Sequence, residues 1–269
     1  MKSLRKTETI YPQSYIIKSD RGFEKKFNWT FSNIKWFLEA EETTDFYEKS
    51  IKELEPYIKK SKTVIDIGCG IGSFSISLAK KGLDITAIDM SSKVIEVLRK
   101  RAQKNLIQNI NTYNSKFESI TNKESYDIVL MSYMMGLVND SNMEKILNMS
   151  NKYVVLILPI DEIKNDFSIT ELYERIGMNI ELLKQQTYKE LLEPLDRFKI
   201  KYDLKLIQSD FGQPFDSKEE ALSFIKYYFK IPMIKNMQLV NWIEEKLIIK
   251  NKKYYLPNKK RSAMILIKV

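Results

Sequence analysis

Hydrophobic and polar positions switch between two periods along the chain, and this switching predicts helices that alternate with strands. Between residues 30 and 60 the apolar positions recur at helical spacing, which predicts one or two helices. Short apolar runs then predict strands at 63–67, 84–88, 112–114, 126–131 and 153–158. Helices are expected between them, beginning near Phe74, after Ser91 and at the capping box Ser141-x-x-Glu144. This order predicts a doubly wound, mostly parallel α/β sheet with helices on both faces.

The rhythm changes after Pro159. Capping boxes beginning at Ser168 and Asp216 predict helices, a further helix is expected at 239–249, and strands are expected at 203–208 and 263–269. The last strand lies about 90 residues beyond Pro159, far more than an ordinary connection requires. We therefore expect an N-terminal helical cap at 1–60 and a core domain at 61–269 with a lid-like insertion at about 160–250.

Composition and charge narrow the setting of the protein. No apolar run approaches the ~20 residues that span a bilayer, and the basic N-terminus has no apolar stretch of the signal-peptide kind. We expect a cytoplasmic protein without a membrane partner, either a monomer or a homodimer. The net charge of +9 permits a nucleic-acid partner, but the lysines are spread along the whole chain, which does not favour one.

The chemistry available to the chain is restricted because it has no histidine and a single cysteine, Cys69. This composition excludes Ser-His and Cys-His nucleophilic systems and ordinary zinc sites, so no metal is expected. Carboxylates, tyrosines, lysines, backbone groups or a cofactor must supply the chemistry. No catalytic residue can be assigned from the sequence.

The segment with the clearest chemical meaning runs from Val64 to Ser73 and reads V-I-D-I-G-C-G-I-G-S. A strand that feeds a glycine turn and then a helix lets the backbone approach a ligand closely. A dinucleotide site needs G-x-G-x-x-G, whereas here Ser73 stands where the third glycine belongs. Asp66 inside the strand would oppose a pyrophosphate and would suit a cationic amino group. A nicotinamide oxidoreductase is therefore the least favoured reading.

The residues D-I-G-C-G-I-G resemble the first motif of the class I S-adenosylmethionine-dependent methyltransferases. The resemblance implies a seven-stranded sheet whose last strand is antiparallel. It also implies that S-adenosylmethionine is the cofactor, that Gly68, Gly70 and Gly72 curve round its amino-acid part, and that Asp66 lies near its amino group. A turn that merely connects a strand to a helix is the structural alternative.

Residues after the next strands complete the expected cofactor site. Asp89 ends the second strand, where a carboxylate can accept hydrogen bonds from both ribose hydroxyls, although an Asp there can also cap a helix. Met90 would offer an apolar wall to the adenine. Phe117 would stack on the adenine face, or would instead be a core residue under the sheet. Ser132, after the fourth strand, would face the methionine part of the cofactor.

The methyl acceptor is less well defined. Tyr133 is a candidate contact for it, with a packed aromatic side chain as the alternative. The loop Ser132–Gly136 lacks the Asn-Pro-Pro-Tyr motif of methyltransferases that modify adenine or glutamine amides. We expect a small-molecule acceptor, covered by aromatic residues of the insertion and by Trp29, Trp36 and Tyr47. The alternatives are an RNA or protein methyltransferase and a non-catalytic, cofactor-binding partner subunit; a dimer interface would also explain the apolar insertion.

Overall fold

A computed structural model describes residues 29–121 and 124–269. Its main body is a seven-stranded sheet in the order β3-β2-β1-β4-β5-β10-β6. The strands are β1 (Thr63–Ile67), β2 (Asp84–Asp89), β3 (Ile110–Asn114), β4 (Tyr126–Ser132), β5 (Ser150–Pro159), β6 (Tyr202–Asp210) and β10 (Lys259–Lys268). Only β10 runs antiparallel to its neighbours, β5 and β6. The predicted fold class, with its antiparallel last strand, is confirmed.

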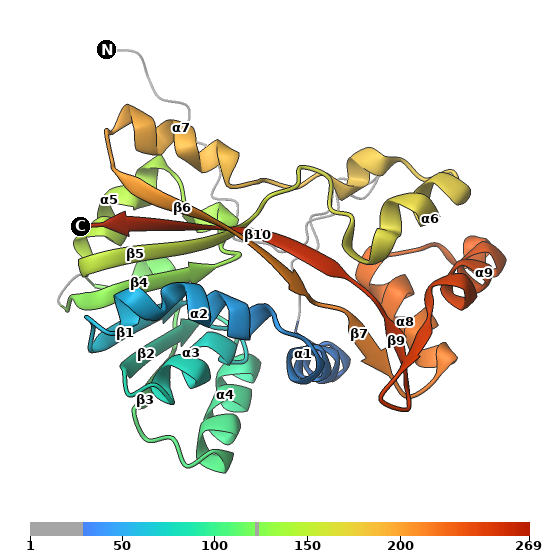
Figure 1. The fold of residues 1–269 in the computed structure, drawn as a ribbon, viewed down its shortest axis with the longest axis horizontal. Helices are drawn as coiled ribbons and strands as arrows, with labels where there is room; N and C mark the ends of the chain where they lie inside the picture. Colours follow the sequence, from blue (N-terminus) through green and yellow to red (C-terminus); the bar gives the residue numbers. More distant parts are fainter. Residues whose placement is uncertain (1–28, 122–123) are drawn as a thin grey trace.

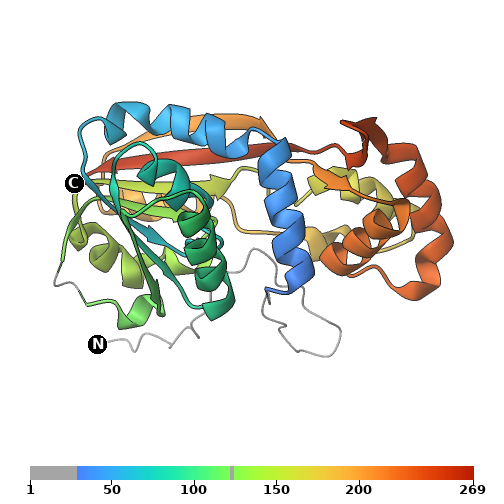
Figure 2. The same cartoon turned by 90° about the horizontal axis from the view of Figure 1, so that it is seen from below.

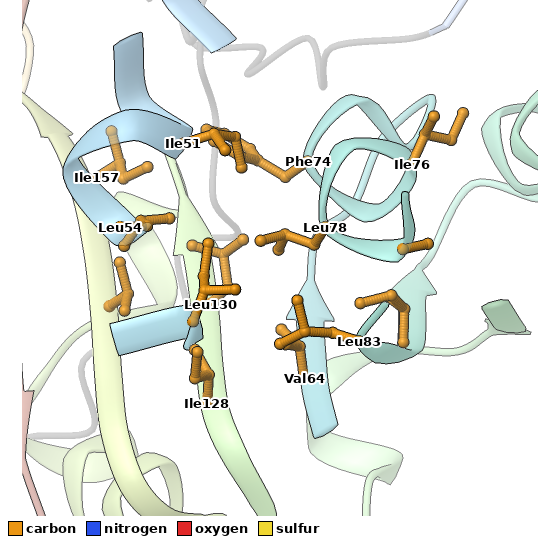
Figure 3. Close-up of a cluster of buried hydrophobic side chains, with 14 of the residues drawn as sticks. Ile51, Leu54, Val64, Phe74, Ile76, Leu78, Leu83, Ile128, Leu130 and Ile157 are labelled. Atoms are coloured by element: carbon orange, nitrogen blue, oxygen red, sulfur yellow. The ribbon is translucent and has the colours of Figure 1, made fainter. Parts of the chain in front are cut away.

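Helices cover both faces of this sheet, as the pattern predicted (Figure 1). One face carries α2 (Phe46–Ile58), α3 (Ser73–Ala79) and α4 (Ser92–Lys104); the other carries α5 (Asp140–Asn148) and α7 (Lys189–Arg197). Side chains alternate along each strand, so Val64 packs on the first face while Ile65 packs on the second. Figure 3 shows Leu54 of α2 and Leu78 of α3 meeting Leu130 of β4 in the first of these cores.

A second, smaller lobe lies beside the sheet domain (Figure 1). It contains α6 (Ile169–Arg175), α8 (Lys218–Phe229), α9 (Asn236–Lys246) and a three-stranded antiparallel sheet of β7 (Gln213–Phe215), β9 (Lys253–Leu256) and β8 (Ile248–Lys250). Tyr173, Phe215 and Trp242 are fully buried in its own core. The stretch from 160 to 250 is therefore not one continuous insertion, because α7 and β6 within it belong to the sheet domain.

Helix α1 (Phe31–Thr43) lies between the two lobes, and Figure 2 shows it crossing the space that separates them. Trp36 packs into the core of the small lobe. Ile34 packs against Ile71 and Val94 of the sheet domain. The helix thus contributes to two cores at once. The part of the expected cap that covers residues 1–28 lies outside the described residues.

Three predicted helix starts differ from the structure. Two are displaced by one or two residues, and the third lacks the expected capping hydrogen bond. Helix α5 begins after Asn139, whose side chain accepts a hydrogen bond from Asn142 N, so Ser141 already lies inside the helix. Helix α8 is capped by Ser217 in the same way, one residue after the predicted Asp216. Ser168 does precede α6, but it adopts a left-handed conformation and makes no capping hydrogen bond.

The predicted helix at 239–249 is correct in kind but extends too far. It ends at Lys246, and Ile248–Lys250 forms strand β8 instead. Leu247 is extended, and β8 pairs with β9 across a tight turn at Asn251 and Lys252, both of which have positive φ. Pairing with a neighbouring strand therefore overrides the helical apolar pattern. Within the described residues, no helix combines the length and apolar character needed to cross a bilayer.

Candidate functional site

The glycine turn joins β1 to α3 through three residues with positive φ: Gly68 at 74°, Gly70 at 53° and Gly72 at 82°. The turn is tied to the neighbouring strand, because the N–H groups of Gly68 and Cys69 both donate to Ile88 O at 2.8 and 3.0 Å. Left-handed backbone conformations are costly for residues with a side chain, which explains the glycines at these positions.

The three glycines do not have the same surroundings. A Cβ on Gly68 would collide with the side chain of Met134, and a Cβ on Gly72 would collide with Leu98. A Cβ on Gly70 would meet only Trp29, at 3.6 Å. Gly68 and Gly70 line the cavity above the turn. Gly72 is not among its lining residues, and it instead caps α3 and packs against α4.

Asp66 lies at the floor of this cavity and is only 2% exposed. Its Oδ2 accepts a hydrogen bond from Ser75 Oγ at 2.5 Å. Burial raises the pKa of Asp66 to about 7, although the hydrogen bond from Ser75 opposes that effect. A cationic group beside this carboxyl would favour its charged form, so the site suits the amino group that the resemblance implies.

Asp89 ends β2 and points into the same cavity. Its Oδ2 accepts from Gly70 N at 3.0 Å, and its Oδ1 accepts from Ser91 N at 2.8 Å. Each carboxylate oxygen can accept a second hydrogen bond, so capacity for two ribose hydroxyls remains. Burial raises the pKa of Asp89, against the lowering effect of the two backbone donors. Met90, directly after it, is 47% exposed and also lines the cavity.

Phe117 lies just after β3, and Ser132 is the last residue of β4 rather than the first residue after it. Phe117 is 5% exposed, lines the cavity and also belongs to the core under the sheet. This position accommodates both alternatives for its role, so adenine stacking stays a prediction. Ser132 and Tyr133 both line the cavity. The Tyr133 hydroxyl shares a 2.7 Å hydrogen bond with Ser262 Oγ, and burial raises the pKa of Tyr133, so this phenol is a poor general base.

The cavity that these residues share has a volume of about 490 Å³, within the range of ligand pockets. The cavity continues past the predicted cofactor residues to a wall of aromatic side chains, which is called the aromatic roof below. Trp29, Trp36 and Tyr47, the expected cover residues, all line it. The small lobe and its approaches contribute Asp166, Phe167, Phe211, Gln213, Phe224, Tyr228, Asn258 and Lys260.

Sequence reasoning missed most of the polar residues on the roof side. Lys260, Asp166 and Asn258 carry no local signal, because each is one of many similar residues in a segment expected to be a loop or a strand edge. Phe211 and Phe224 did stand out among the aromatics of the insertion, and the structure places both on the cavity. Other members of that aromatic set, such as Trp242, lie in the core of the small lobe instead.

A second cavity of about 970 Å³ adjoins the first. The two share four lining residues: Tyr133, Asp166, Tyr228 and Lys260. Its remaining wall mixes apolar side chains with polar and charged ones, including Lys184, Gln185, Gln186 and Lys189. A partly polar space therefore adjoins the aromatic one, and no residue of the glycine turn lines it.

A family model for a methyltransferase domain matches residues 58–199. The chain belongs to this methyltransferase family. The resemblance inferred from the glycine turn is thereby confirmed, and S-adenosylmethionine is the cofactor of this class. The residues around the turn fit that cofactor: the backbone at Gly70 is open to a ligand, Asp66 faces the cavity with an elevated pKa, and Asp89 keeps acceptor capacity.

Matches to curated methyltransferases are local. A ribosomal protein L11 methyltransferase from Acetivibrio thermocellus is 31% identical over 88 residues, which are 32% of this chain and 28% of the relative. A ubiquinone biosynthesis O-methyltransferase from Acinetobacter baumannii is 36% identical over 81 residues, which are 29% of this chain and 34% of the relative. The chain thus spans roughly a third of the length of these relatives.

Among solved structures, YcgJ from Bacillus subtilis superposes with a TM-score of 0.49 and 15% identity, covering 81% of this chain and 98% of that protein.

Proposed function

We propose that this chain transfers a methyl group from S-adenosylmethionine to a small, largely apolar molecule bound under the aromatic roof. One observation carries the proposal: a single cavity contains both the glycine-turn residues and the aromatic residues of α1 and the small lobe. A small acceptor in its aromatic part would lie beside the cofactor. A macromolecular acceptor would have to reach past the roof.

S-adenosylmethionine supplies an electrophilic methyl group on a sulfonium, which is transferred by in-line displacement. The residues of this chain then have to align the acceptor and exclude water. Phe211 contributes to the aromatic roof, and the rings of Phe37 and Phe46 each make an edge contact with that of Phe211, with centroids 5.7 and 5.6 Å away. Because burial raises the pKa of Tyr133, its hydroxyl keeps its proton. The hydroxyl would therefore orient the acceptor rather than remove a proton from it. In this proposal Asp66, Gly68, Gly70, Asp89, Met90, Phe117 and Ser132 bind the cofactor, and Tyr133 contacts the acceptor.

Helix α1 and the small lobe would form the cover of the acceptor. On one side, Trp36 Nε1 donates to Glu220 Oε1 at 3.0 Å and Asn33 Nδ2 donates to Tyr227 OH at 3.0 Å. On the other side, Glu41 accepts from Ser73 Oγ and from Arg101 Nη2, both at 2.6 Å. These bonds fasten the helix to both lobes across the cavity. They support a cover made of α1, from the predicted cap, and of the small-lobe part of the predicted insertion.

The local relatives do not decide between acceptor classes, because one is named for a ribosomal protein and the other for ubiquinone biosynthesis. The proposal is tested by following S-adenosylhomocysteine release with amines, thiols, phenols and carboxylates, and separately with tRNA and ribosomal protein. Transfer to a small molecule is expected. Transfer only to RNA or protein, retained at about 200 mM salt where non-specific phosphate contacts are largely lost, would contradict it.

A roof variant separates acceptor binding from cofactor binding. Phe211→Ala removes a cavity wall and should lower transfer to the small acceptor by about tenfold or more, equal to about 1.4 kcal/mol, while cofactor affinity stays within about twofold. Phe198→Ala is the matched control, because Phe198 is 54% exposed and does not line the cavity. If the two variants transfer methyl equally well, the aromatic roof does not hold the acceptor. A change of mass in solution would instead favour a dimer interface.

A further inference from the structure

One lysine of the roof carries a charge in unusual surroundings. Lys260 lies near the start of β10, opposite Ser209 of β6, and lines both cavities. Its Nζ faces three aromatic rings, at 4.1 Å from the ring centroid of Tyr133, 4.6 Å from Phe211 and 5.0 Å from Phe46. Across the residues that the structure describes, no hydrogen bond or ion pair is found for this ammonium group. Ring faces stabilise a cation only partly.

The nearby carboxylate is already engaged. Asp166 Oδ2 forms an ion pair with Lys164 Nζ at 3.4 Å, and Lys164 also donates to Tyr228 OH at 3.2 Å. Lys164, Lys260 and Asp166 therefore meet at the boundary between the cavities. Burial lowers the pKa of both lysines, to about 7 for Lys164, while the charge of Asp166 opposes this effect. An anion beside Lys260 would give its ammonium group the hydrogen-bonding partner that it lacks among the described residues.

We propose that Lys260 binds the carboxylate of a small monocarboxylic acid, and that the methyl acceptor belongs to this class. The inference rests on the proposed function, because the cluster lies on the acceptor side of the cofactor residues. The aromatic rings around the ammonium group select an apolar body. One lysine offers few donors, which favours a carboxylate over a phosphate dianion, because a phosphate would need more of them.

If Lys260 binds the acceptor, its charge serves binding and does not stabilise the fold, and the two roles can be separated by experiment. A half-buried ammonium without an anionic partner does not stabilise the fold, so replacing it with an isosteric neutral side chain should not lower the melting temperature. Lys260→Met tests this directly. Lys260→Arg keeps the charge but cannot act as a general base, and it should therefore retain acid binding. Lys268→Met is the control, because Lys268 is exposed at the opposite end of the same strand.

The experiment uses the full chain saturated with S-adenosylhomocysteine. Small aromatic and aliphatic monocarboxylic acids, each paired with its primary amide, are screened by thermal shift, and binders are measured by calorimetry. In the wild type the acids should bind about tenfold or more tighter than their amides, as expected for a charge-assisted hydrogen bond. This preference should vanish in Lys260→Met and persist in Lys260→Arg and Lys268→Met.

The proposal would be overturned by amides that bind as well as acids, by an acid preference that survives in Lys260→Met, or by a large drop in melting temperature for that variant. A screen in which no acid binds to the loaded chain would overturn it as well. Failure of the chain to bind S-adenosylhomocysteine in the first place would instead refute the proposed function. The two failures are therefore distinguishable.

Discussion

Asp89 offers the sharpest test of the cofactor site because both its carboxylate oxygens already accept backbone hydrogen bonds, from Gly70 N at 3.0 Å and Ser91 N at 2.8 Å. The same carboxylate would therefore both hold the glycine turn in place and bind the ribose. Asp89→Asn keeps one acceptor oxygen and turns an amide toward the other donor. Loss of charge-assisted bonds of this kind costs about 1.5–3 kcal/mol, so affinity for S-adenosylmethionine should fall by about 10- to 150-fold.

The measurement is calorimetry of wild type and variant with S-adenosylmethionine, together with thermal unfolding without ligand. Unfolding reports damage to the turn, whereas calorimetry on the folded variant reports lost ligand contacts. Asp84→Asn is the matched control, because Asp84 begins the same strand, is exposed and lies away from the cavity. It should bind like the wild type. If Asp89→Asn binds within about twofold of the wild type, this carboxylate does not hold the cofactor.

Two predictions concern stability without ligand. Gly72→Ala should lower the free energy of unfolding by about 2–4 kcal/mol, because it adds a clash with Leu98 to the strain of a left-handed backbone. Gly82 also has a positive φ but faces open space, so Gly82→Ala should lower this free energy by only about 1–2 kcal/mol. Chemical denaturation measures both. Equal losses would contradict the packing role of Gly72. Asp66→Asn should flatten the pH dependence of stability: with the folded pKa of Asp66 at about 7 and the unfolded value at 3.8, wild-type stability falls as pH rises from about 4 to about 7. A variant that loses stability over this range as the wild type does would refute the elevated pKa.

Local signals explain why the sheet domain was predictable. Its central strands β1, β4 and β5 are mostly buried and read as apolar runs, and each is followed by a turn or a bend within a few residues. The glycine turn also has a local cause, because its positive φ angles restrict the residue type at each position. Asp66 and Asp89 could be placed on one cavity since the carboxyl ends of neighbouring parallel strands lie together.

The small lobe was harder to predict because its strands pair with segments that lie far away in the sequence. Strands β7 and β9 are short and meet across about 40 residues of chain, so neither has a pattern of its own. Ile248 and Ile249 are apolar but exposed, and they extended the predicted helix where a strand forms. The ammonium of Lys260 gave no signal either, because only the register of β10 against β6 brings it to the cavity.

A single antiparallel ribbon explains how the two lobes and the roof residues are held together. Strand β6 ends at Asp210 and β7 begins at Gln213, while β9 ends at Leu256 and β10 begins at Lys259, so the β6–β10 pairing continues into the β7–β9 pairing. Figure 1 shows the two long strands running from one lobe into the other.

At the junction of this ribbon the ladder is interrupted, and Asn258 takes over. Its backbone O accepts from Phe211 N at 2.9 Å, its Nδ2 donates to Phe211 O at 3.2 Å, and its Oδ1 accepts from Phe167 N at 3.0 Å. Phe211, Asn258 and Lys260 all line the cavity at this point. A binding group on paired strands is held more precisely than one on a loop. The proposed acceptor site therefore includes residues that lie outside the segment matched by the methyltransferase model, yet backbone pairing ties them to the main sheet.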